Sequence, residues 1–174
     1  MKRHELISSI MFDYEEYNRE RIVELCQPLP RKLLRWLGIH HPDNWTRKIF
    51  YEMTNVEIGE GTVVNQNFIV SDNYEPLLKI GQRVAIAPNV TVICVSEPNN
   101  SLLQKYSSVQ KKLIRSEPVI IENDVWIGAH VTLLPGIRIG EKSIIGAGSV
   151  VNNDIPPKSI AAGVPAKVLR QVEE

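Results

Sequence analysis

The chain has 174 residues, and its 20 lysine and arginine residues balance its 20 aspartate and glutamate residues, so its formal net charge is zero. This length suits one domain with a core large enough to fold without disulfides or a structural metal. The balanced charge shows no basic excess that would suggest a nucleic-acid partner, and no polybasic membrane anchor is present, so neither partner is expected. No segment approaches the roughly 18 apolar residues of a membrane span.

The two cysteines, Cys26 and Cys94, show no CxxC spacing. Isolated thiols of this kind are typical of buried or incidental cysteines in a reducing compartment. The apolar run near the start of the chain is too short for a signal peptide. We therefore expect a cytoplasmic protein.

Residues 1–54 are predicted to form a helical segment. Between Tyr14 and Trp36, apolar residues recur at helical spacing, and Pro28 and Pro30 interrupt them. This pattern predicts two short amphipathic helices with a break at the QPLP segment. Because a bare solenoid end exposes apolar side chains and strand edges, we expect these helices to cap the repeats that follow.

Residues 55–160 contain aliphatic residues spaced six apart, with a second small or apolar residue two positions before each. The six-residue series comprises Ile58, Val64, Val70, Ile80, Ile86, Val92, Ile121, Ile127, Leu133, Ile139, Ile145 and Val151. This period fits neither an amphipathic helix nor a hairpin sheet, but it fits short strands separated by corners, three to a coil. It predicts an all-β solenoid, a left-handed parallel β-helix of about four coils. Gly128, Gly140 and Gly146 are expected at corners that need a permissive backbone.

Two insertions interrupt this rhythm, a short one at residues 73–77 and a long one at residues 96–118. A long excursion from a regular solenoid is usually functional, and its apolar content predicts that it packs on a neighbouring chain. The tail, residues 161–174, is expected to run extended and then finish as a short helix.

Residues 119–170, which contain DVWIG and end in DIPPKSIAAGVPAKVLR, resemble the hexapeptide-repeat acyltransferases. The segments IGQRVAIAPNVTV and SDNY extend the likeness to the galactoside and maltose O-acetyltransferase branch, over roughly residues 55–170. The resemblance implies acetyl transfer from acetyl-CoA to an acceptor, in sites between the subunits of a homotrimer. It also implies that the N-terminal helices help to wall an acceptor pocket, a role that stays open beside capping.

Family members usually carry a histidine as general base where the long insertion begins, and this chain has Glu97 there. Three interpretations remain open. As general base, Glu97 needs its pKa raised from about 4.3 towards neutrality, which burial against a neighbouring subunit would provide. As an acceptor-binding carboxylate, it leaves the base elsewhere. As a solvated corner residue, it has no role. His130 is expected to point outward from a corner.

The resemblance assigns further residues to the acceptor. Asn65 matches an asparagine that binds the acceptor and assists at the reacting hydroxyl, so it is a second catalytic candidate. The expected substrate-binding residues are Asn67, Asn73 and Trp126. Asparagine amides both donate and accept hydrogen bonds, as a sugar hydroxyl requires. Alternatively, these asparagines have a purely structural role, because asparagine tolerates the left-handed backbone of solenoid corners.

For coenzyme A, the resemblance implies a groove between subunits that is contacted largely by backbone. Ala129 and Ala147 match positions that bind the pantetheine amides. The residues that match the nucleotide end are Asn152, Asn153, Lys167 and Arg170. Asn152 and Asn153 stand where the family often has threonine and lysine, so one cation is missing. Lys167 and Arg170, three apart on the expected helix, either face the phosphates or form a solvated basic face.

The predicted function is direct, acetyl-CoA-dependent O-acetylation of a sugar or glycan-precursor hydroxyl. Two alternatives remain. N-acetylation of an amino sugar needs less help from a base, and a non-catalytic solenoid would only bind or assemble. A zinc-dependent enzyme, such as the carbonic anhydrases that share this fold, needs three converging histidines. The sequence places no such triplet on adjacent coils, so no metal is expected.

Overall fold

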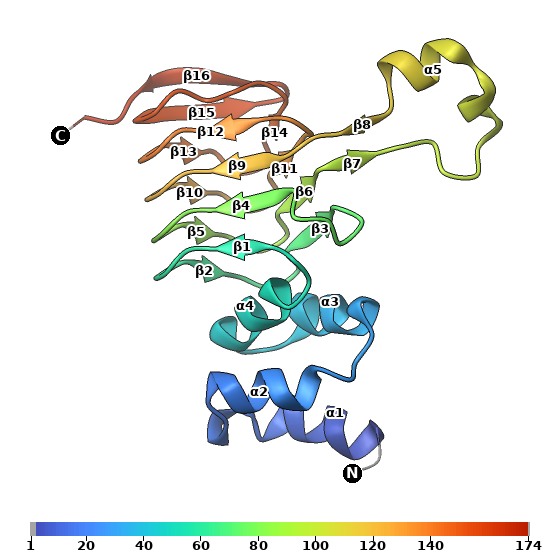
Figure 1. Ribbon diagram of the computed structural model, residues 1–174. Helices are drawn as coiled ribbons and strands as arrows, with labels where there is room; N and C mark the ends of the chain where they lie inside the picture. Colours follow the sequence, from blue (N-terminus) through green and yellow to red (C-terminus); the bar gives the residue numbers. More distant parts are fainter. Residues whose placement is uncertain (1–2, 174) are drawn as a thin grey trace.

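The computed structural model describes residues 3–173 (Figure 1). A helical segment lies at its N-terminal end, a stack of short strands follows, and one long arm leaves the stack near its middle. The described ends of the chain are therefore at opposite ends of the molecule.

The helical segment contains α1 (Arg3–Phe12), α2 (Arg19–Cys26), α3 (Arg31–His40) and α4 (Asn44–Glu52). The two predicted helices are confirmed as α2 and α3, and the QPLP break separates them. Helices α1 and α4 were not expected. The start of α4 is nevertheless encoded locally, because the Asp43 carboxylate accepts a hydrogen bond from the N–H of Thr46 at 2.7 Å, which is an N-cap.

We call these four helices the helical cap. They bury their own apolar core and lie against the first turn of the stack (Figure 1). Hydrogen bonds join the two parts: the N–H of Asn67 donates to Ile39 O at 3.1 Å, and Arg47 Nε donates to Val64 O at 2.9 Å. The helices therefore cover the end of the solenoid, as the sequence predicts.

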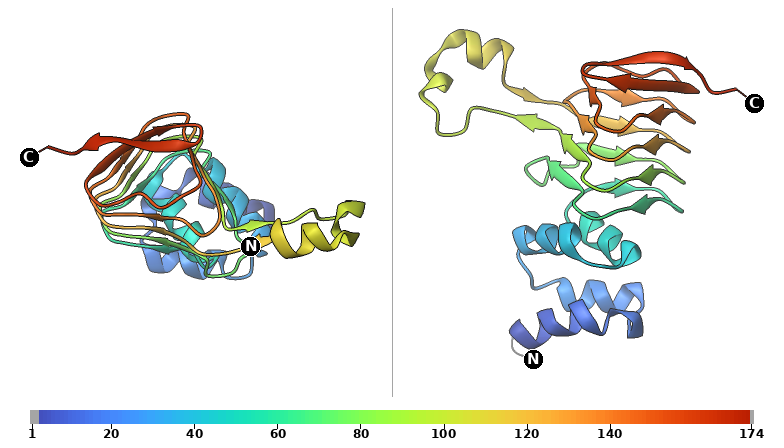
Figure 2. Two further views of the ribbon diagram at one scale, coloured as in Figure 1. Left: turned by 90° about the horizontal axis from the view of Figure 1, so that it is seen from above. Right: turned by 180° about the vertical axis from the view of Figure 1, so that it is seen from behind.

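The stack has three faces, each a sheet of parallel strands from successive turns (Figure 2). Face A contains β1 (Glu57–Ile58), β4 (Leu78–Ile80), β9 (Val119–Ile121) and β12 (Arg138–Ile139). Face B contains β2 (Val63–Val64), β5 (Ala85–Ile86), β10 (Trp126–Ile127), β13 (Ile144–Ile145) and β15 (Ser159–Gly163). Face C contains β3 (Ile69–Ser71), β6 (Thr91–Ile93), β11 (Thr132–Leu133) and β14 (Val150–Val151).

The register of these strands confirms the six-residue phase. The residues stacked in columns are Ile58, Ile80, Ile121 and Ile139 on face A; Val64, Ile86, Ile127 and Ile145 on face B; and Val70, Val92, Leu133 and Val151 on face C. Nearly all of these side chains are buried, and Ile58 and Val70 of the first turn are partly buried. Each turn therefore covers the apolar side chains of the turn below it.

The prediction that the repeat glycines are needed for a permissive corner backbone is wrong. Gly128, Gly140 and Gly146 do not have positive φ. A Cβ on Gly128 would lie 2.6 Å from Ala147 N, and one on Gly140 would lie 2.4 Å from Pro157 N. Glycine is therefore required by the close approach of the next turn.

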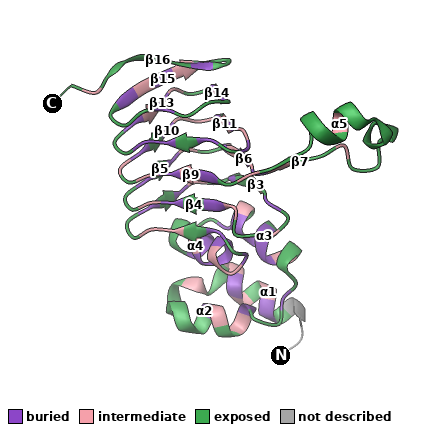
Figure 3. Cartoon of the chain, turned by 45° about the horizontal axis from the view of Figure 1, so that its top comes forward, coloured by how far each residue is buried: buried purple, intermediate pink, exposed green. Residues whose placement is uncertain are grey.

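The long insertion forms an arm that extends away from the stack in both views (Figures 1 and 2). Its base is an antiparallel pair, β7 (Val95–Ser96) and β8 (Arg115–Ser116), and its tip holds a 3₁₀ turn (Leu102–Lys105) and α5 (Ser107–Lys112). The arm is largely exposed (Figure 3). Its exposed large apolar residues are Leu102, Leu103, Tyr106, Leu113 and Ile114.

The predicted C-terminal helix is wrong, because Ala166–Gln171 forms a strand, β16, which pairs antiparallel with β15. The tail thus gives the last strand of face B a partner and covers an edge that would otherwise be open. Local helical spacing in the tail is overridden by this pairing. Within residues 3–173, no helix is both long enough and apolar enough to span a bilayer.

We predict that Leu133→Asp prevents folding. Leu133 is completely buried between Val92 and Val151, so the substitution places an unpaired charge in the core, at a cost of several kcal/mol. The measurement is soluble yield and thermal midpoint. Gln82→Asp, on an exposed corner, is the control and should change stability by less than about 0.5 kcal/mol. A normal midpoint for Leu133→Asp would overturn the inward assignment.

Candidate active site

The site residues predicted from sequence separate into two groups. The first group lies at the corner that leads from face C to face A, which we call the CA corner: Asn73, Glu97, Asn152 and Asn153. The second lies on face B and at the corner between faces B and C, the BC corner: Asn65, Asn67, Trp126, Ala129, Ala147, Lys167 and Arg170. Members of one group share an edge or face of the solenoid but lie on different turns, and the two groups lie on different edges.

At the CA corner, the base of the arm and the upper turns form a groove of about 320 Å³. Its lining residues are Ile93, Ser96, Leu113, Arg115, Leu134, Pro135 and Asn152. A second hollow of about 240 Å³ shares Ser96 and Leu113 with this groove and contains Glu97. Glu97 and Asn152, which are far apart in sequence, therefore lie along one continuous surface.

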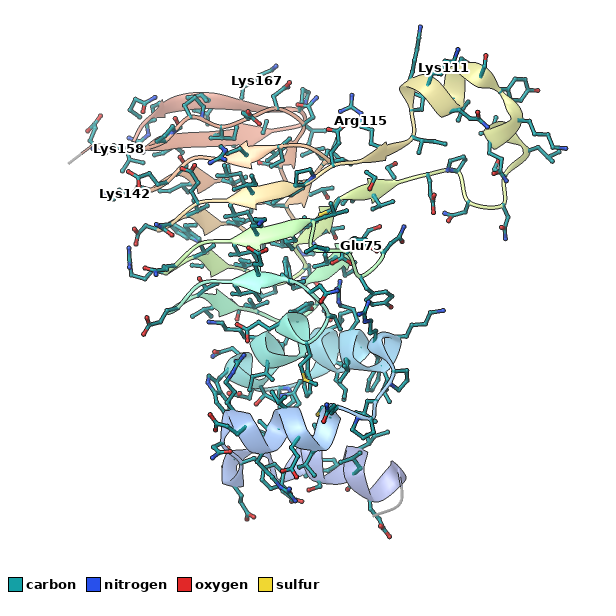
Figure 4. The ribbon with its side chains drawn as sticks, viewed as in Figure 1. Glu75, Lys111, Arg115, Lys142, Lys158 and Lys167 are labelled. Carbon is teal, nitrogen blue, oxygen red and sulfur yellow. The ribbon has the colours of Figure 1, made fainter. Side chains whose placement is uncertain are left out.

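Arg115 is a residue of this groove that the sequence analysis missed. It lies on β8 at the base of the arm, next to the upper turns (Figure 4), and its guanidinium is 4.0 Å from the carboxylate of Glu117. Because Asn153 stands where the family often has a lysine, the corner lacks that cation. Arg115 supplies a positive charge in the same groove as Asn152. The six-residue repeat gives no indication of Arg115, because this residue belongs to the long insertion.

Glu97 is exposed in the single chain. Within residues 3–173, its carboxylate makes no hydrogen bond or ion pair, although its backbone carbonyl accepts from Asn99 Nδ2 at 3.4 Å. The carboxylate is thus free to meet a partner that the single chain does not supply. Asn73 is also exposed, with φ 52°, at the short insertion on the turn below.

The BC corner carries hydrogen-bonding groups in columns. Asn65 Nδ2 donates to Ile86 O at 2.8 Å, which orients the amide and leaves Oδ1 available. Asn67 Nδ2 donates to Asn89 Oδ1 at 3.0 Å, and Asn89 Nδ2 lies 3.3 Å from Nε2 of His130. The imidazole of His130 is exposed, as expected, and joins this ladder.

Ala129 and Ala147 occupy equivalent positions of successive turns at the BC corner. The N–H of Gly148 donates to Ala129 O at 2.8 Å. Among the described residues, the N–H groups of Ala129 and Ala147 donate to no carbonyl. Two amides without a carbonyl acceptor, one strand spacing or about 4.8 Å apart, are candidate donors to an extended ligand chain.

The parallel strands of face B present an uncharged outer surface, and among the described residues charge appears only at the top of the face, on β16. Its outward column consists of Val63, Ala85, Trp126, Ile144 and Ile160. The Trp126 ring is 57% exposed. The outward column of face C is also uncharged: Ile69, Thr91, Thr132 and Val150. Face A instead presents Glu57, Lys79, Ile120 and Arg138.

Lys167 and Arg170 lie on the same surface, but not because they are three apart on a helix as predicted. Residues three apart on a regular strand point to opposite sides, but a bulge opposite Ile160 and Ala161 shifts the register. Lys167 consequently pairs with Ala162, and Arg170 pairs with Ile160. Both exposed cations therefore lie on the outer side of face B. Figure 4 shows Lys167 near the top of the solenoid.

The two predicted catalytic residues do not meet within one chain. Asn65 precedes face C, whereas Glu97 follows it one turn higher. The three-residue strand β3 alone spans about 10 Å. One hydroxyl cannot contact both side chains in a single chain, so the two predicted catalytic residues lie in separate candidate half-sites.

Neither a metal site nor a thiol nucleophile is apparent. Among the residues that the structure describes, no three histidine, cysteine, aspartate or glutamate side chains converge as metal ligands. Cys94 is completely buried, and burial raises the pKa of its thiol to about 11. A thiol of this kind is not a nucleophile at neutral pH.

Comparison with known proteins identifies the family. Residues 118–153 match the family model for the bacterial transferase hexapeptide of six repeats. Galactoside O-acetyltransferase of Escherichia coli K12 is 42% identical over 121 residues, which is 70% of this chain and 56% of that protein. The chain thus spans about half the length of the curated relatives it matches.

Solved structures agree with this match. A galactoside acetyltransferase in complex with coenzyme A is 31% identical with a TM-score of 0.56, covering 82% of this chain and 79% of that one. A hexapeptide-repeat acetyltransferase of Vibrio cholerae, in complex with acetyl coenzyme A, is 26% identical with a TM-score of 0.65, covering 83% and 86%. The chain belongs to the hexapeptide-repeat acyltransferases and is similar to their galactoside and maltose branch. This membership implies the predicted left-handed winding.

We predict that Cys94 is unreactive in the folded protein. Because its enclosed thiol has a pKa of about 11, almost none of it is thiolate at pH 8. Labelling by a thiol reagent at pH 8 should be slow, and unfolding in guanidinium should release two reactive thiols, since Cys26 is buried as well. Rapid labelling of Cys94 in the folded protein would contradict the enclosed position.

Proposed function

We propose that this protein is an acetyl-CoA-dependent O-acetyltransferase that acts on a sugar or glycan-precursor hydroxyl by direct transfer. The observation that carries the proposal is the division of the predicted site between the CA corner and the BC corner. Each corner has a distinct set of functional groups, and a neighbouring chain would complete them. The relatives named as galactoside O-acetyltransferases support the acceptor class.

The proposed assembly is a homotrimer. The parallel strands of faces B and C are uncharged on the outside, and the arm exposes apolar side chains that a monomer would leave in water. A heterologous contact repeated around a three-fold axis closes without leaving an unpaired surface. In our proposal, this contact places the CA corner of one chain beside the BC corner of the next, with the arm over the neighbour.

Acetyl-CoA would lie between the two corners and supply an activated acetyl group. The N–H groups of Ala129 and Ala147 are the candidate donors to its pantetheine amides. The candidate partners of its nucleotide end are Asn152, Asn153, Arg115, Lys167 and Arg170. Because Lys167 and Arg170 lie on face B and Asn152 lies on the CA corner, these groups would converge only across two chains.

In the proposed reaction, Glu97 accepts the proton of the acceptor hydroxyl as the hydroxyl oxygen attacks the thioester carbonyl. The C–S bond of the tetrahedral intermediate would then break, and the departing coenzyme A thiolate would take the proton from Glu97, which regenerates the carboxylate. The carboxylate needs to be less solvated than in the single chain for this role, and the neighbour's face B beside Trp126 would provide that burial. Asn65, held by Ile86 O, would orient the hydroxyl through its remaining amide groups. Asn67 and Asn73 are proposed as acceptor contacts.

Amine acetylation is the second candidate, and the absence of a histidine at position 97 favours it. An amine nucleophile needs less assistance from a base than a hydroxyl does. The third candidate function is binding or assembly without catalytic activity. We further propose a cytoplasmic location, since both cysteines are free. We also propose that the chain has three functional units: residues 1–54 as the cap, 55–160 as the β-helix and 161–174 as the closing segment.

Replacing Glu97 by glutamine tests the base. Glu97→Gln keeps the shape but removes basicity, so kcat should fall about 10²–10⁴-fold while coenzyme A affinity stays constant. The measurement is thiol release with a panel of sugars and amino sugars. Glu60→Gln, on the corner between faces A and B, is the matched control and should leave kcat unchanged. A raised acceptor KM with normal kcat would make Glu97 an acceptor ligand instead.

Mixing two inactive variants tests the shared site. Glu97→Gln and Asn65→Ala disable opposite half-sites, so each homotrimer should be weakly active. Co-refolded mixtures should recover up to about one quarter of wild-type activity, since that fraction of interfaces pairs two intact half-sites. Sedimentation should show a trimer throughout. Failure to recover activity in verified mixed trimers, or a stable monomer at micromolar concentration, would contradict the shared site.

A further inference from the structure

The helical cap carries an arginine in an unusual environment. The Arg35 side chain on α3 is only 7% exposed, and that of its partner Asp72 is 2% exposed. Charged side chains are almost never this buried unless they are paired, and a buried pair stabilises a fold no better than apolar packing does. A cap that only had to cover the first turn would not need this pair.

Arg35 reaches from the cap to the short insertion at the CA corner. Its two terminal nitrogens donate to the two carboxylate oxygens of Asp72, at 3.2 and 3.1 Å. The guanidinium also donates to Val70 O at 3.1 Å and to Thr54 Oγ1 at 3.0 Å. Among the described residues, no buried side-chain polar atom here lacks a partner. The guanidinium thus has a single, fully specified position.

Asp72 passes this constraint to the turn that holds Asn73. Its Oδ1 also accepts from the N–H of Tyr74 at 3.0 Å, and Glu75 N donates to Asp72 O at 2.9 Å. The turn ends at Glu75, which is labelled in Figure 4. One carboxylate therefore binds the arginine on one side and closes the turn around Asn73 on the other.

The turn has a backbone that it would not readily adopt alone. Asn73 and Tyr74 have φ of 52° and 61°, and a bulky aromatic residue rarely occupies this region. The surroundings hold it there: Asn55 Nδ2 donates to Tyr74 O at 2.6 Å, and the Tyr74 ring lies 5.3 Å from the guanidinium carbon of Arg35. Backbone of this kind persists only where its environment over-determines it, and it is concentrated at functional sites.

We propose that Arg35 is a positioning residue for the acceptor side of the active site, acting through Asp72 on Asn73. This inference rests on the proposed function and assigns the cap a role beyond covering apolar surface. The buried pair holds the turn that carries the exposed Asn73 at the CA corner, one turn below Glu97. Acceptor recognition is thereby linked to the docking of α3 on the solenoid.

Two variants test this role, Arg35→Lys and Asp72→Asn. Both retain hydrogen-bonding capacity, but the first removes the two-pronged contact and the second removes the carboxylate charge. We expect the acceptor KM to rise about ten-fold or more, with kcat changed much less and coenzyme A affinity unchanged. The larger truncation Arg35→Gln should raise KM further. The matched control is Arg83→Lys, which alters another two-pronged pair, with Asp124 at 2.6 and 2.8 Å, on the corner remote from both half-sites.

Hydrogen exchange supplies a readout that does not depend on activity. In Arg35→Lys, the amides of Tyr74 and Glu75 should exchange about ten-fold faster, while Gly128 and Gly146 keep their rates. Unchanged exchange at the turn would overturn the positioning role even if the wild type proves inactive. Faster exchange with an unchanged acceptor KM would overturn the link to the acceptor. Absence of transfer by the wild type with every acceptor would refute the proposed function and the acceptor link together, and the exchange result would still decide whether Arg35 holds the turn.

Discussion

The stacking of inward aliphatic side chains from one turn onto the next is the interaction on which the whole structure depends. Each turn is only three short strands long, and it has no core until another turn covers it. The columns of Ile, Val and Leu therefore require strict register. That requirement explains the six-residue phase and the glycines at points where a Cβ would meet the backbone of the next turn.

A stack held together in this way must be closed at both ends. The helical cap closes the first turn with hydrogen bonds to Val64, Phe68 and Val70 carbonyls as well as with apolar packing. At the other end, β16 folds back along β15. Both ends also place polar groups at predicted site positions. Arg35 reaches the turn at Asn73, and the bulge puts Lys167 and Arg170 on the same side of the sheet.

The three faces differ in what they present outward. Face A is charged and includes the Glu57–Lys79 pair at 3.0 Å, as expected for a face in water. The parallel strands of faces B and C are uncharged on the outside, and they border the corners where we propose the two half-sites. Our proposal of a shared site follows from this arrangement, since one surface of each chain has the groove and the arm, and another has the amide column and Trp126.

The sequence by itself determined the solenoid. Six-residue periodicity is a direct consequence of stacking, so the inward residues, the two insertions and the helices on either side of QPLP were all predictable. Family resemblance also identified residues at both corners. These features depend on local spacing along the chain, which a sequence displays.

Only the tertiary structure decided how these residues are distributed. The tail forms a strand because the open edge of β15 offers hydrogen-bond partners, which no pattern within residues 161–174 reveals. Arg115 joins the groove, and Arg35 pairs with Asp72 thirty-seven residues away, because α3 docks under the first turn. Asn65 and Glu97 lie at separate corners because a strand of face C stands between them. Contacts between distant segments depend on how the turns stack and where the cap docks, and spacing along the chain does not encode them.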